Sequence, residues 1–462
     1  MVAVVWFRND LRLSDHLALD AAVKTGQPIL PIFIYDNTHP RLLGEASKWW
    51  LHHSLAFLKS SLDKLNADLI FRQGNAFEVL TDIATKAPIS HVFWHRRYEP
   101  DGMQQDTKIK SYFKEHNIIC KSFNGSLLFE PHTIQNKENK PFKVFSAFWR
   151  HCLTQNSLER PIPTPERLNF DPQFKKLSDT QESLGLLPHH NWIKGLEESW
   201  KPGETNAQKI LEIFLDNNLS NYKKNRDYPA MKTSRLSPYI RWGEISIRQL
   251  WHAIHQCNIF NGHEIDSTCF LSELGWREFS YHTLFHNTNL TDEPLRKDFK
   301  NFPWQKNQRF FDAWTKGKTG YPIVDAGMRE LWTTGYMHNR VRMITASFLI
   351  KHLLQPWQDG EQWFWDTLVD ADAASNPFNW QWVAGCGADA APYFRIFNPT
   401  LQGEKFDPKS EYIKHWVPEL RNTPDKFVHT PWLYKNKSNS YPTPLVDHQN
   451  ARQKALQAFK GI

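Results

Sequence analysis

The first 125 residues alternate short apolar runs with amphipathic stretches. Five runs rich in β-branched and aromatic side chains have the length of strands, at residues 2–7, 29–35, 68–72, 91–95 and 118–123. Between them, apolar side chains recur at helical spacing near 15–24, 44–65, 76–86 and 101–116. Strands that alternate with helices in this way predict an open, doubly wound parallel sheet, and therefore an α/β domain over residues 1–125.

The turn after the first predicted strand carries no glycine pattern. It reads RNDLRLSDH at residues 8–16, whereas a dinucleotide-binding sheet has G-x-G-x-x-G at this point. The glycines of that motif let a pyrophosphate approach the backbone closely. We therefore expect that this sheet does not bind a dinucleotide in the usual manner.

The periodic pattern is lost between residues 126 and 205. RPIPTPERLNFDPQF at 160–174 contains four prolines, and KPGET at 201–205 marks another break. Proline-rich, aperiodic sequence favours a long interdomain linker, draped over the surface and containing some short helices.

Residues 206–462 show long helical periods and few β-branched runs. The clearest helical stretches are 207–219, 245–256, 334–354 and 361–372. This half is predicted to be an all-α domain. The expected fold class is thus an α/β doubly wound N-terminal domain joined by the linker to an all-α C-terminal domain.

Aromatic residues are the unusual feature of the composition, with 20 Trp, 31 Phe and 13 Tyr in 462 residues. A large aromatic core would explain them, and so would a chain that stacks on something flat, such as a flavin or a nucleobase. The net charge of +7 permits contact with phosphate groups without demonstrating it.

Several other classes of protein find no support in the sequence. The five cysteines form no C-x-x-C pair, so we expect neither a disulfide framework nor a metal site. Neither H-E-x-x-H nor G-x-S-x-G occurs. The start lacks the features of a signal peptide, and no stretch is long enough to span a membrane, which predicts a soluble, cytoplasmic protein.

Candidate chemistry begins with a short polar run before a predicted helix. It consists of Thr233, Ser234, Arg235, Leu236 and Ser237. Three hydroxyl groups, free backbone N–H groups and a guanidinium make a suitable cradle for a pyrophosphate. A helix-capping turn with a solvated arginine is the alternative interpretation.

A second candidate is a helical face that combines Glu273, Trp276 and Arg277 at spacings i, i+3 and i+4. An acid, an indole and a guanidinium on one stripe suit a polar aromatic ligand. A surface ion pair beside a core tryptophan explains the same pattern.

A third candidate is the stretch 336–348. Asn339, Arg342 and Met343 share one helical face, and Arg340 lies about 100° away from them. These side chains either reach into a charged groove or form a solvated helix end.

The fourth candidate is the stretch 368–382. Asp370, Asp372 and Asn376 are suited either to hydrogen-bond a uracil-like edge or to cap a helix. Trp380 and Trp382 follow, and positions i and i+2 of a helix point about 200° apart. The two rings therefore serve different surfaces, so we expect both sides of this helix to be covered.

Together, these blocks make the chain resemble the photolyase/cryptochrome family over nearly its whole length. VVWFRNDLRLSDHLAL is similar to the N-terminal signature of that family. Four further blocks resemble the flavin domain of that family, namely YPAMKTSRLSPYI, ELGWREF, GKTGYPIVDAGMRELWTTGYMHNRVRM and NWQWVAGCGADAAPYFRIFNPTLQGEKFD. The resemblance implies an α/β antenna domain followed by a helical domain that binds FAD in a bent form, which agrees with the missing glycine motif.

The resemblance also implies which residues contact FAD. By matched position they are Tyr222, Thr233, Ser234, Arg235, Leu236, Ser237, Phe270, Arg277, Asn339, Arg342, Asp370, Asp372 and Asn376. Arg342 is expected to pair with Asp370 beside the flavin, and Asn376 to lie near flavin N5. Relatives often have tryptophan in place of Phe270.

The activity that the resemblance implies is the light-driven repair of cyclobutane pyrimidine dimers flipped out of DNA. The residues matched to the dimer pocket are Glu273, Trp276, Asn339, Met343 and Trp382, and those matched to the DNA strand are Arg226, Arg340 and Gln402. Glu273 is expected to hydrogen-bond the dimer carbonyls and to act in catalysis together with Asn376. The residues matched to the electron path that ends at the flavin are Trp380, Trp357 and Trp304.

Position 339 distinguishes branches of the family. Members that repair (6-4) photoproducts carry a second histidine after the one matching His338, and plant cryptochromes usually carry aspartate there. Asn339 followed by RVRM resembles the enzymes that repair cyclobutane dimers. We also expect no signalling tail after the last residues, and Tyr336 departs from the tryptophan of many relatives.

The expected partner is damaged DNA, bound by a monomer, and the expected antenna is methenyltetrahydrofolate. A deazaflavin antenna or an empty antenna site stays open. Two other functions also stay open, namely a cryptochrome-like blue-light receptor without repair activity and a nucleic-acid-binding protein without photochemistry.

Overall fold

The structure, a computed structural model, describes residues 1–155, 158–188, 192–390, 394–434 and 440–462, so residues 391–393 of the last quoted block lie outside it. Its N-terminal part confirms the predicted sheet, with five parallel strands in the order β3-β2-β1-β4-β5. The strands are β1 (Val2–Phe7), β2 (Ile29–Tyr35), β3 (Ile70–Gln73), β4 (Ile89–His95) and β5 (Ile119–Phe123). The helices between them are α1 (Leu17–Lys24), α2 (Glu45–Asp63), α3 (Ala76–Lys86) and α4 (Pro100–Glu115).

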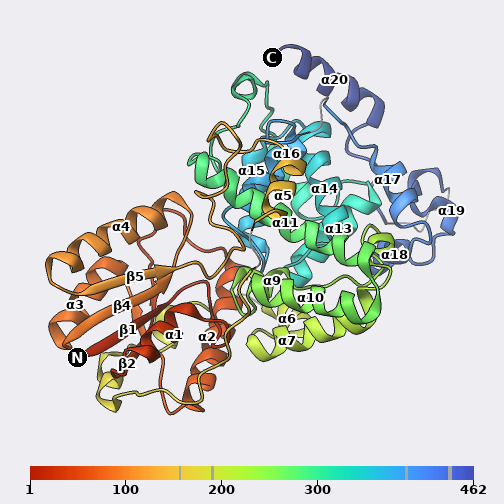
Figure 1. Cartoon of the computed structure of the whole chain (residues 1–462). Coiled ribbons are helices and arrows are strands. Elements are labelled where there is room, and N and C mark those ends of the chain that lie inside the picture. The colour runs from red at the N-terminus through yellow and green to blue at the C-terminus, as the bar shows by residue number, and fades with distance from the viewer. Residues whose placement is uncertain (156–157, 189–191, 391–393, 435–439) are drawn as a thin grey trace.

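Helices cover both faces of this sheet (Figure 1). Every residue of β1 and β2 is buried, as expected for parallel strands at the centre of a sheet. Alternate residues of β1 belong to different cores: Val5 packs with residues of α1 and α2, and Val4 packs with residues of α3 and α4. The period of two along the strand therefore explains why the strand is apolar on both sides.

The glycine-free turn after β1 is filled by its own side chains. Asp10 accepts a hydrogen bond from the backbone N–H of Arg8 at 2.5 Å and another from His95 Nδ1 at 2.7 Å, and it lies 3.1 Å from His16 Nε2. His16 Nδ1 accepts from the N–H of Leu19 and so caps α1. Burial lowers the pKa of His95 to about 3, so its ring is neutral. This network occupies the place where a glycine-rich turn would admit a phosphate.

The connecting segment differs from the prediction in one part. It forms the expected short helices, η1 (Pro172–Leu177), η2 (Glu182–Leu184), α5 (Phe145–Leu153) and α6 (Ile193–Ser199). Helix α5, however, buries Phe148, Trp149 and Cys152 in the same core as α11, beside which it lies in Figure 1. The apolar face of α5 therefore holds this part of the segment in the core, whereas the prediction placed it on the surface. The domain boundaries at 125 and 205 remain predictions.

The remainder is helical, as predicted. Its α-helices are α7 (Glu204–Ile213), α8 (Tyr222–Asn225), α9 (Ser237–Arg241), α10 (Ile247–Asn261), α11 (Glu264–His286), α12 (Gln308–Thr315), α13 (Pro322–Thr334), α14 (Asn339–Ser347), α15 (Trp357–Thr367), α16 (Ser375–Ala384), α17 (Pro399–Phe406), α18 (Glu411–Trp416), α19 (Asp425–Val428) and α20 (His448–Lys460). Short π-helices are η3 (Phe214–Asn218) and η5 (Phe348–His352), and short 3₁₀-helices are η4 (Lys297–Asn301), η6 (Pro418–Leu420) and η7 (Pro431–Leu433).

Two of the predicted helices have different bounds. The predicted helix over 334–354 is interrupted, because Gly335 adopts a left-handed φ of 65° that ends α13, and α14 begins only after His338. The predicted helix over 361–372 begins earlier, with α15, and ends at Thr367. Asp370 and Asp372 therefore lie in the loop before α16, and not on a helix.

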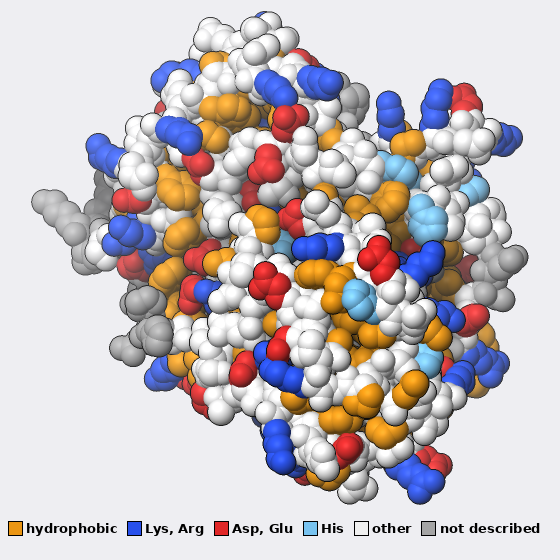
Figure 2. Space-filling model, turned by 90° about the vertical axis from the view of Figure 1, so that its left-hand side faces the viewer, with side chains coloured by type: hydrophobic (Ala, Val, Ile, Leu, Met, Phe, Trp, Pro, Cys, Tyr) orange, Lys and Arg blue, Asp and Glu red, His pale blue; other side chains and the backbone are white. Residues whose placement is uncertain are grey.

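None of the helices among the described residues combines the length and the apolar character that crossing a bilayer requires. Figure 2 shows one face of the molecule, on which acidic and basic side chains are interspersed. The net positive charge is therefore not gathered into one basic patch on this face.

The contact between η5 and α20 should make stability depend on pH. His352 Nε2 lies 2.9 Å from His448 Nδ1, and burial, together with His448 and Lys351, lowers the pKa of His352 to about 3. A folded-state pKa below the unfolded value means that stability is present above about pH 6.5 and is lost as the pH falls. Between pH 7.5 and pH 5, His352 alone should cost about 2 kcal/mol of unfolding free energy.

Urea unfolding at the two pH values measures this loss. In the His352→Gln protein the difference between pH 7.5 and pH 5 should shrink by about 2 kcal/mol. An unchanged pH dependence in that variant would contradict the assignment to His352.

Candidate functional site

An ion pair between α14 and the loop before α16 lies at the centre of the helical part. Arg342 Nη2 donates to Asp370 Oδ2 at 2.8 Å, and Arg342 Nε donates to the carbonyl of Met337 at 2.7 Å. Ser237, the first residue of α9, donates its hydroxyl to the same Asp370 oxygen at 2.6 Å. The expected Arg342–Asp370 pair is therefore present, and it joins two of the sequence candidates to the polar run before α9.

The other oxygen of Asp370 is available to a ligand. Asp370 is 8% exposed, and its Oδ1 is buried without a hydrogen-bond partner among the described residues. An unsatisfied buried carboxylate oxygen is costly, and an N–H or O–H donor from a ligand would satisfy it.

The polar run before α9 surrounds this pair. Arg235 has a left-handed φ of 51°, and its guanidinium lies 4.1 Å from the ring of Trp200 and 5.4 Å from that of Tyr336. Leu236 is buried, and its N–H approaches Ser234 Oγ at 3.5 Å, while Thr233 is half-buried. The run thus anchors one apolar side chain and leaves hydroxyl groups and a guanidinium at the surface.

Two further candidates form an aromatic cluster. Tyr222 and Phe270 are buried, with ring centroids 5.4 Å apart, and both rings contact Phe214 of η3. The exposed fraction of Phe270 is only 3%, so its contacts here are mainly with protein.

Asp372 serves the capping role that the sequence left open. Its Oδ1 accepts from the N–H groups of Ala374 and Ser375, at 3.0 and 2.7 Å, and its Oδ2 accepts from the hydroxyl of Tyr281 at 2.7 Å. Arg277 lies over the ring of Tyr281 and donates to the carbonyl of Ser126. These contacts fasten α16 and the connecting segment to α11.

The side chain of Asn376 is oriented by a residue that the sequence analysis missed. Asn376 Nδ2 donates to the backbone carbonyl of Glu361 at 3.0 Å and to its Oε1 at 2.8 Å. The Glu361 carboxylate, 3% exposed, is held in turn by Arg41 Nη2 at 2.7 Å. Arg41 belongs to the α/β part, and its guanidinium stacks 3.8 Å from the ring of Trp365. The amide of Asn376 is thereby fixed, with its oxygen directed away from Glu361.

Removal of Arg41 tests this arrangement. The Arg41→Leu variant leaves a buried carboxylate without its counter-ion, so we expect the unfolding free energy to fall by about 3 kcal/mol. Arg41→Lys keeps the charge but loses the stacking and part of the hydrogen bonding, so it should fall by a smaller amount. Urea unfolding of the three proteins measures the difference, and equal stability of Arg41→Leu and wild type would contradict the pair's importance.

A second group of candidates lies around α11 and α14. Arg226 donates to the carboxylate of Glu273 on α11, and the next residue, Asp227, accepts from Arg340 Nη2 of α14 at 2.7 Å. Consecutive residues after α8 therefore join the two helices. Arg340 also lies against Met343 Sδ, at 3.7 Å.

Two candidates remain, and they lie on α14 and α17, beside the rim that Arg226, Asp227, Glu273 and Arg340 form. Asn339 is exposed at the start of α14, and Gln402 of α17 is half-buried. The guanidinium of Arg340 lies 4.5 Å from the ring of Phe406, also of α17. His338, which caps α14, has its pKa lowered to about 4 by burial and lies close enough to Arg340 to interact with it electrostatically.

Trp276 and Trp382 are both half-buried, and each is held by a neighbour. The ring of Trp276 stacks on Phe145 of α5, with centroids 3.8 Å apart and planes at 11°. Trp382 Nε1 donates to the carbonyl of Asp389 at 3.1 Å.

Trp380 points into the core on the other side of α16. Its ring lies 6.2 Å from Trp314 and 5.0 Å from Phe364, and α15 approaches it so closely that a Cβ at Gly360 would be 2.2 Å from the ring. Trp380 is 3% exposed and Trp382 is only partly buried, so one side of α16 is fully covered and the other only in part. Trp357 is fully buried at the start of α15, whereas Trp304 is half-buried and contacts Phe302.

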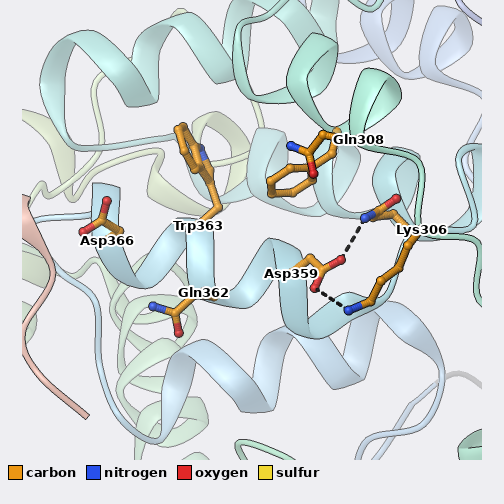
Figure 3. Close-up of a pocket in the computed structure, with 8 residues that line it drawn as sticks. Lys306, Gln308, Asp359, Gln362, Trp363 and Asp366 are labelled. Carbon is orange, nitrogen blue, oxygen red and sulfur yellow. Dashed lines mark hydrogen bonds and ion pairs between the residues drawn. The ribbon is translucent and has the colours of Figure 1, made fainter.

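A hollow lies elsewhere, on the exposed side of α15 (Figure 3). It has a volume of about 440 Å³, and its lining residues are Lys306, Gln308, Phe311, Gln355, Asp359, Gln362, Trp363 and Asp366. Asp359 accepts a hydrogen bond from Gln355 and approaches Lys306 at 3.9 Å. None of the candidate residues from the sequence lines this hollow.

Comparison with known families agrees with both halves of the fold. Residues 270–461 match the family described as the FAD binding domain of DNA photolyase. Residues 3–166 match the family described as DNA photolyase. The first match includes the residues of α11, α14 and α16 described above.

Known proteins resemble the chain along its whole length. The deoxyribodipyrimidine photo-lyase of Agrobacterium fabrum is 46% identical, over 99% of this chain and 98% of its own. Cryptochrome-1 of Arabidopsis thaliana is 35% identical, over 99% of this chain and 70% of its own. A crystal structure of a bacterial class III photolyase from Agrobacterium tumefaciens superimposes with a TM-score of 0.96 at 45% identity, covering 99% of this chain and 97% of that one.

Proposed function

Because the chain belongs to the photolyase and cryptochrome family, we propose that it uses light to repair cyclobutane pyrimidine dimers in DNA. The identity of 46% to a deoxyribodipyrimidine photo-lyase exceeds the 35% and 36% to the two Arabidopsis cryptochromes. FAD is the cofactor that the matched family binds.

The single observation that carries the proposal is the meeting of α11 and α14 beside α8. Arg226 bonds to Glu273, and Asp227 bonds to Arg340, so Arg226, Glu273 and Arg340, three of the residues matched to dimer and DNA contacts, lie on one rim. A carboxylate, aromatic rings and guanidinium groups at one place suit a flipped pyrimidine dimer with its flanking phosphates.

The cofactor side fits FAD on the chemistry of its donors and acceptors. The unpartnered Asp370 Oδ1 can accept from a ligand N–H or O–H group, and Arg235 with its neighbouring hydroxyls can bind phosphate. FAD, when bound in its reduced form, would lend an excited electron to the dimer, and that electron would return to the flavin once the cyclobutane ring has split. Arg342 and Asp370 would present a fixed dipole to it, and Glu361 fixes the direction of the Asn376 amide.

On the substrate side, aromatic side chains of the protein can replace the base stacking that a flipped dimer loses. A dimer stacks and pairs poorly, so flipping it costs at most a few kcal/mol. The rings of Trp276 and Trp382 can restore about 1–3 kcal/mol per base by stacking. Glu273, ionised beside Arg226, can accept hydrogen bonds from ring N–H groups of the dimer, and in its protonated form it can donate to the dimer carbonyls.

A lesion panel tests the proposed substrate. Oligonucleotides that carry one cyclobutane dimer, one (6-4) photoproduct or no lesion are illuminated with the reduced protein, and the products are separated by chromatography. We expect only the cyclobutane dimer to be restored to intact bases. Restoration of the (6-4) photoproduct alone would contradict the substrate.

The cryptochrome-like alternative is kept because relatives of that name match nearly the whole chain, as does the structure of the Synechocystis sp. PCC6803 cryptochrome, with a TM-score of 0.90 at 29% identity. It predicts that blue light reduces the bound flavin while no lesion in the panel is repaired.

Methenyltetrahydrofolate remains the proposed antenna. Chromatography of the chromophores released by denaturation identifies it, and a deazaflavin or a second flavin in its place would contradict this part of the proposal.

A further inference from the structure

Phe145 covers one face of Trp276. The two ring planes lie within 11° of each other at a centroid distance of 3.8 Å, the closest ring pair among the described residues. Trp149, also of α5, continues the same orientation, since its ring lies 6.5 Å from that of Phe145 at 11°. The indole therefore has one face against protein, and the position of α5 determines where the other face lies.

Helix α5 and the segment before it are fixed to α11 along their length. A Cβ on Gly275 would lie 2.7 Å from the ring of Trp149, so only glycine allows α5 to come this close. Glu278 accepts from the N–H of Leu128 at 2.9 Å, and His282 Nε2 accepts from the N–H of Phe142 at 3.1 Å. The support behind Trp276 is therefore a rigid part of the core.

Asp389 connects this support to the second tryptophan of the rim. Its Oδ2 accepts from the backbone N–H of Phe145 at 3.3 Å, at the start of α5. Its own carbonyl accepts from Trp382 Nε1 at 3.1 Å. Asp389 adopts a left-handed φ of 51°, which turns its carbonyl and its carboxylate toward different partners.

We propose that Asp389 and Phe145 are positioning residues that set the mutual placement of Trp276 and Trp382 and thereby the recognition of the damaged bases. This inference rests on the proposed function for the identity of the ligand, while the geometry of the two rings does not depend on it. Neither residue needs to touch the DNA, because both act through the rings that they hold.

Substitutions at position 389 separate the hydrogen bond from backbone strain. Asp389→Gly removes the acceptor and tolerates the left-handed backbone, whereas Asp389→Asn keeps an acceptor oxygen and also tolerates it. The dissociation constant for dimer-containing duplex should rise about 2- to 12-fold in Asp389→Gly, as expected for loss of one hydrogen bond. Asp389→Asn should stay near wild type.

Substitutions at position 145 test the stack. Phe145→Leu should weaken dimer binding about 3- to 12-fold, and Phe145→Tyr should restore it. The affinity for undamaged duplex, the FAD content and the melting temperature should change little in any of the four variants. The double variant Asp389→Gly/Phe145→Leu should lose less affinity than the product of the two single losses. The reason is that the Asp389 carboxylate and the Phe145 ring both act on Trp276, the first through the N–H of Phe145 and the second through the stack.

A structure of the Phe145→Leu protein without DNA provides a readout that is independent of repair. Trp276 should leave its present orientation while α11 stays in place. An unmoved Trp276, or equal losses for damaged and undamaged DNA, would overturn the inference. If the wild-type protein shows no preference for dimers, the proposed function fails. The orientation of Trp276 in the structure of the Phe145→Leu protein then still decides whether Phe145 positions Trp276.

Discussion

Replacing Asp370 by alanine is expected to strip the protein of FAD and to lower its unfolding free energy by about 3–5 kcal/mol. The physical reason is that Asp370, itself buried, is the counter-ion of Arg342 and the acceptor of the Ser237 hydroxyl. Without it, a guanidinium stays largely buried without its carboxylate, and the oxygen offered to the cofactor is lost as well.

The flavin absorbance of the purified protein and urea unfolding measure the two effects. Glu138→Gln is the matched control, because it removes one charge from an ion pair with Lys140 in which both side chains are 70% exposed. That change should alter the unfolding free energy by less than about 1 kcal/mol and leave the FAD content unchanged. An Asp370→Ala protein that keeps its full FAD and stability would refute the assignment of this pair to the cofactor site.

Truncation of Trp276 to alanine should abolish most of the preference for damaged DNA. Its ring is half-buried at the rim and backed by Phe145 on one face, so under the proposed function the opposite face would stack on a flipped base. Loss of one stacking platform should weaken the binding of dimer-containing duplex by about 1–3 kcal/mol, or about 5- to 150-fold. Binding of undamaged duplex should be nearly unchanged, because it depends on phosphate contacts.

Trp332→Ala is the matched control for this effect. Trp332 is 50% exposed near the end of α13 and stacks on Trp363, away from α11. Its removal should leave the affinity for damaged DNA unchanged in fluorescence anisotropy titrations. Equal losses in Trp276→Ala and Trp332→Ala would show that Trp276 has no special role.

The sequence predicted the sheet well because its signal is local. Runs such as ILPIFIY, which forms β2, are short, apolar on both faces and separated by amphipathic stretches. The helical half was harder in detail. Gly335 interrupts a long periodic stretch, and the apolar face of α5 follows a segment without periodicity. The end of α13 is a glycine cap, which is a local signal, whereas the position of α5 depends on tertiary packing, which no local pattern contains.

The sequence predicted which residues belong to the candidate site, because they lie in blocks that resemble a known family. It predicted few of the contacts between these residues. The Arg342–Asp370 pair followed from the resemblance, and the structure shows it. Glu361 was missed, although a carboxylate one turn after Trp357, on the buried side of α15, was a usable signal. Its partner Arg41 lies 320 residues earlier, so no pattern within α15 could reveal it. Phe145 was missed because its partner, Trp276, lies on another helix, α11, far along the chain.

The most direct test of the central claim is the fate of one defined thymine dimer in a DNA duplex. The protein, with its FAD reduced, is mixed with this duplex in excess and divided between blue light and darkness. Intact thymines are then counted by chromatography. The account predicts many dimers split per protein molecule in the light and none in the dark. A protein that carries reduced FAD, binds the duplex and splits no dimer under illumination would contradict it.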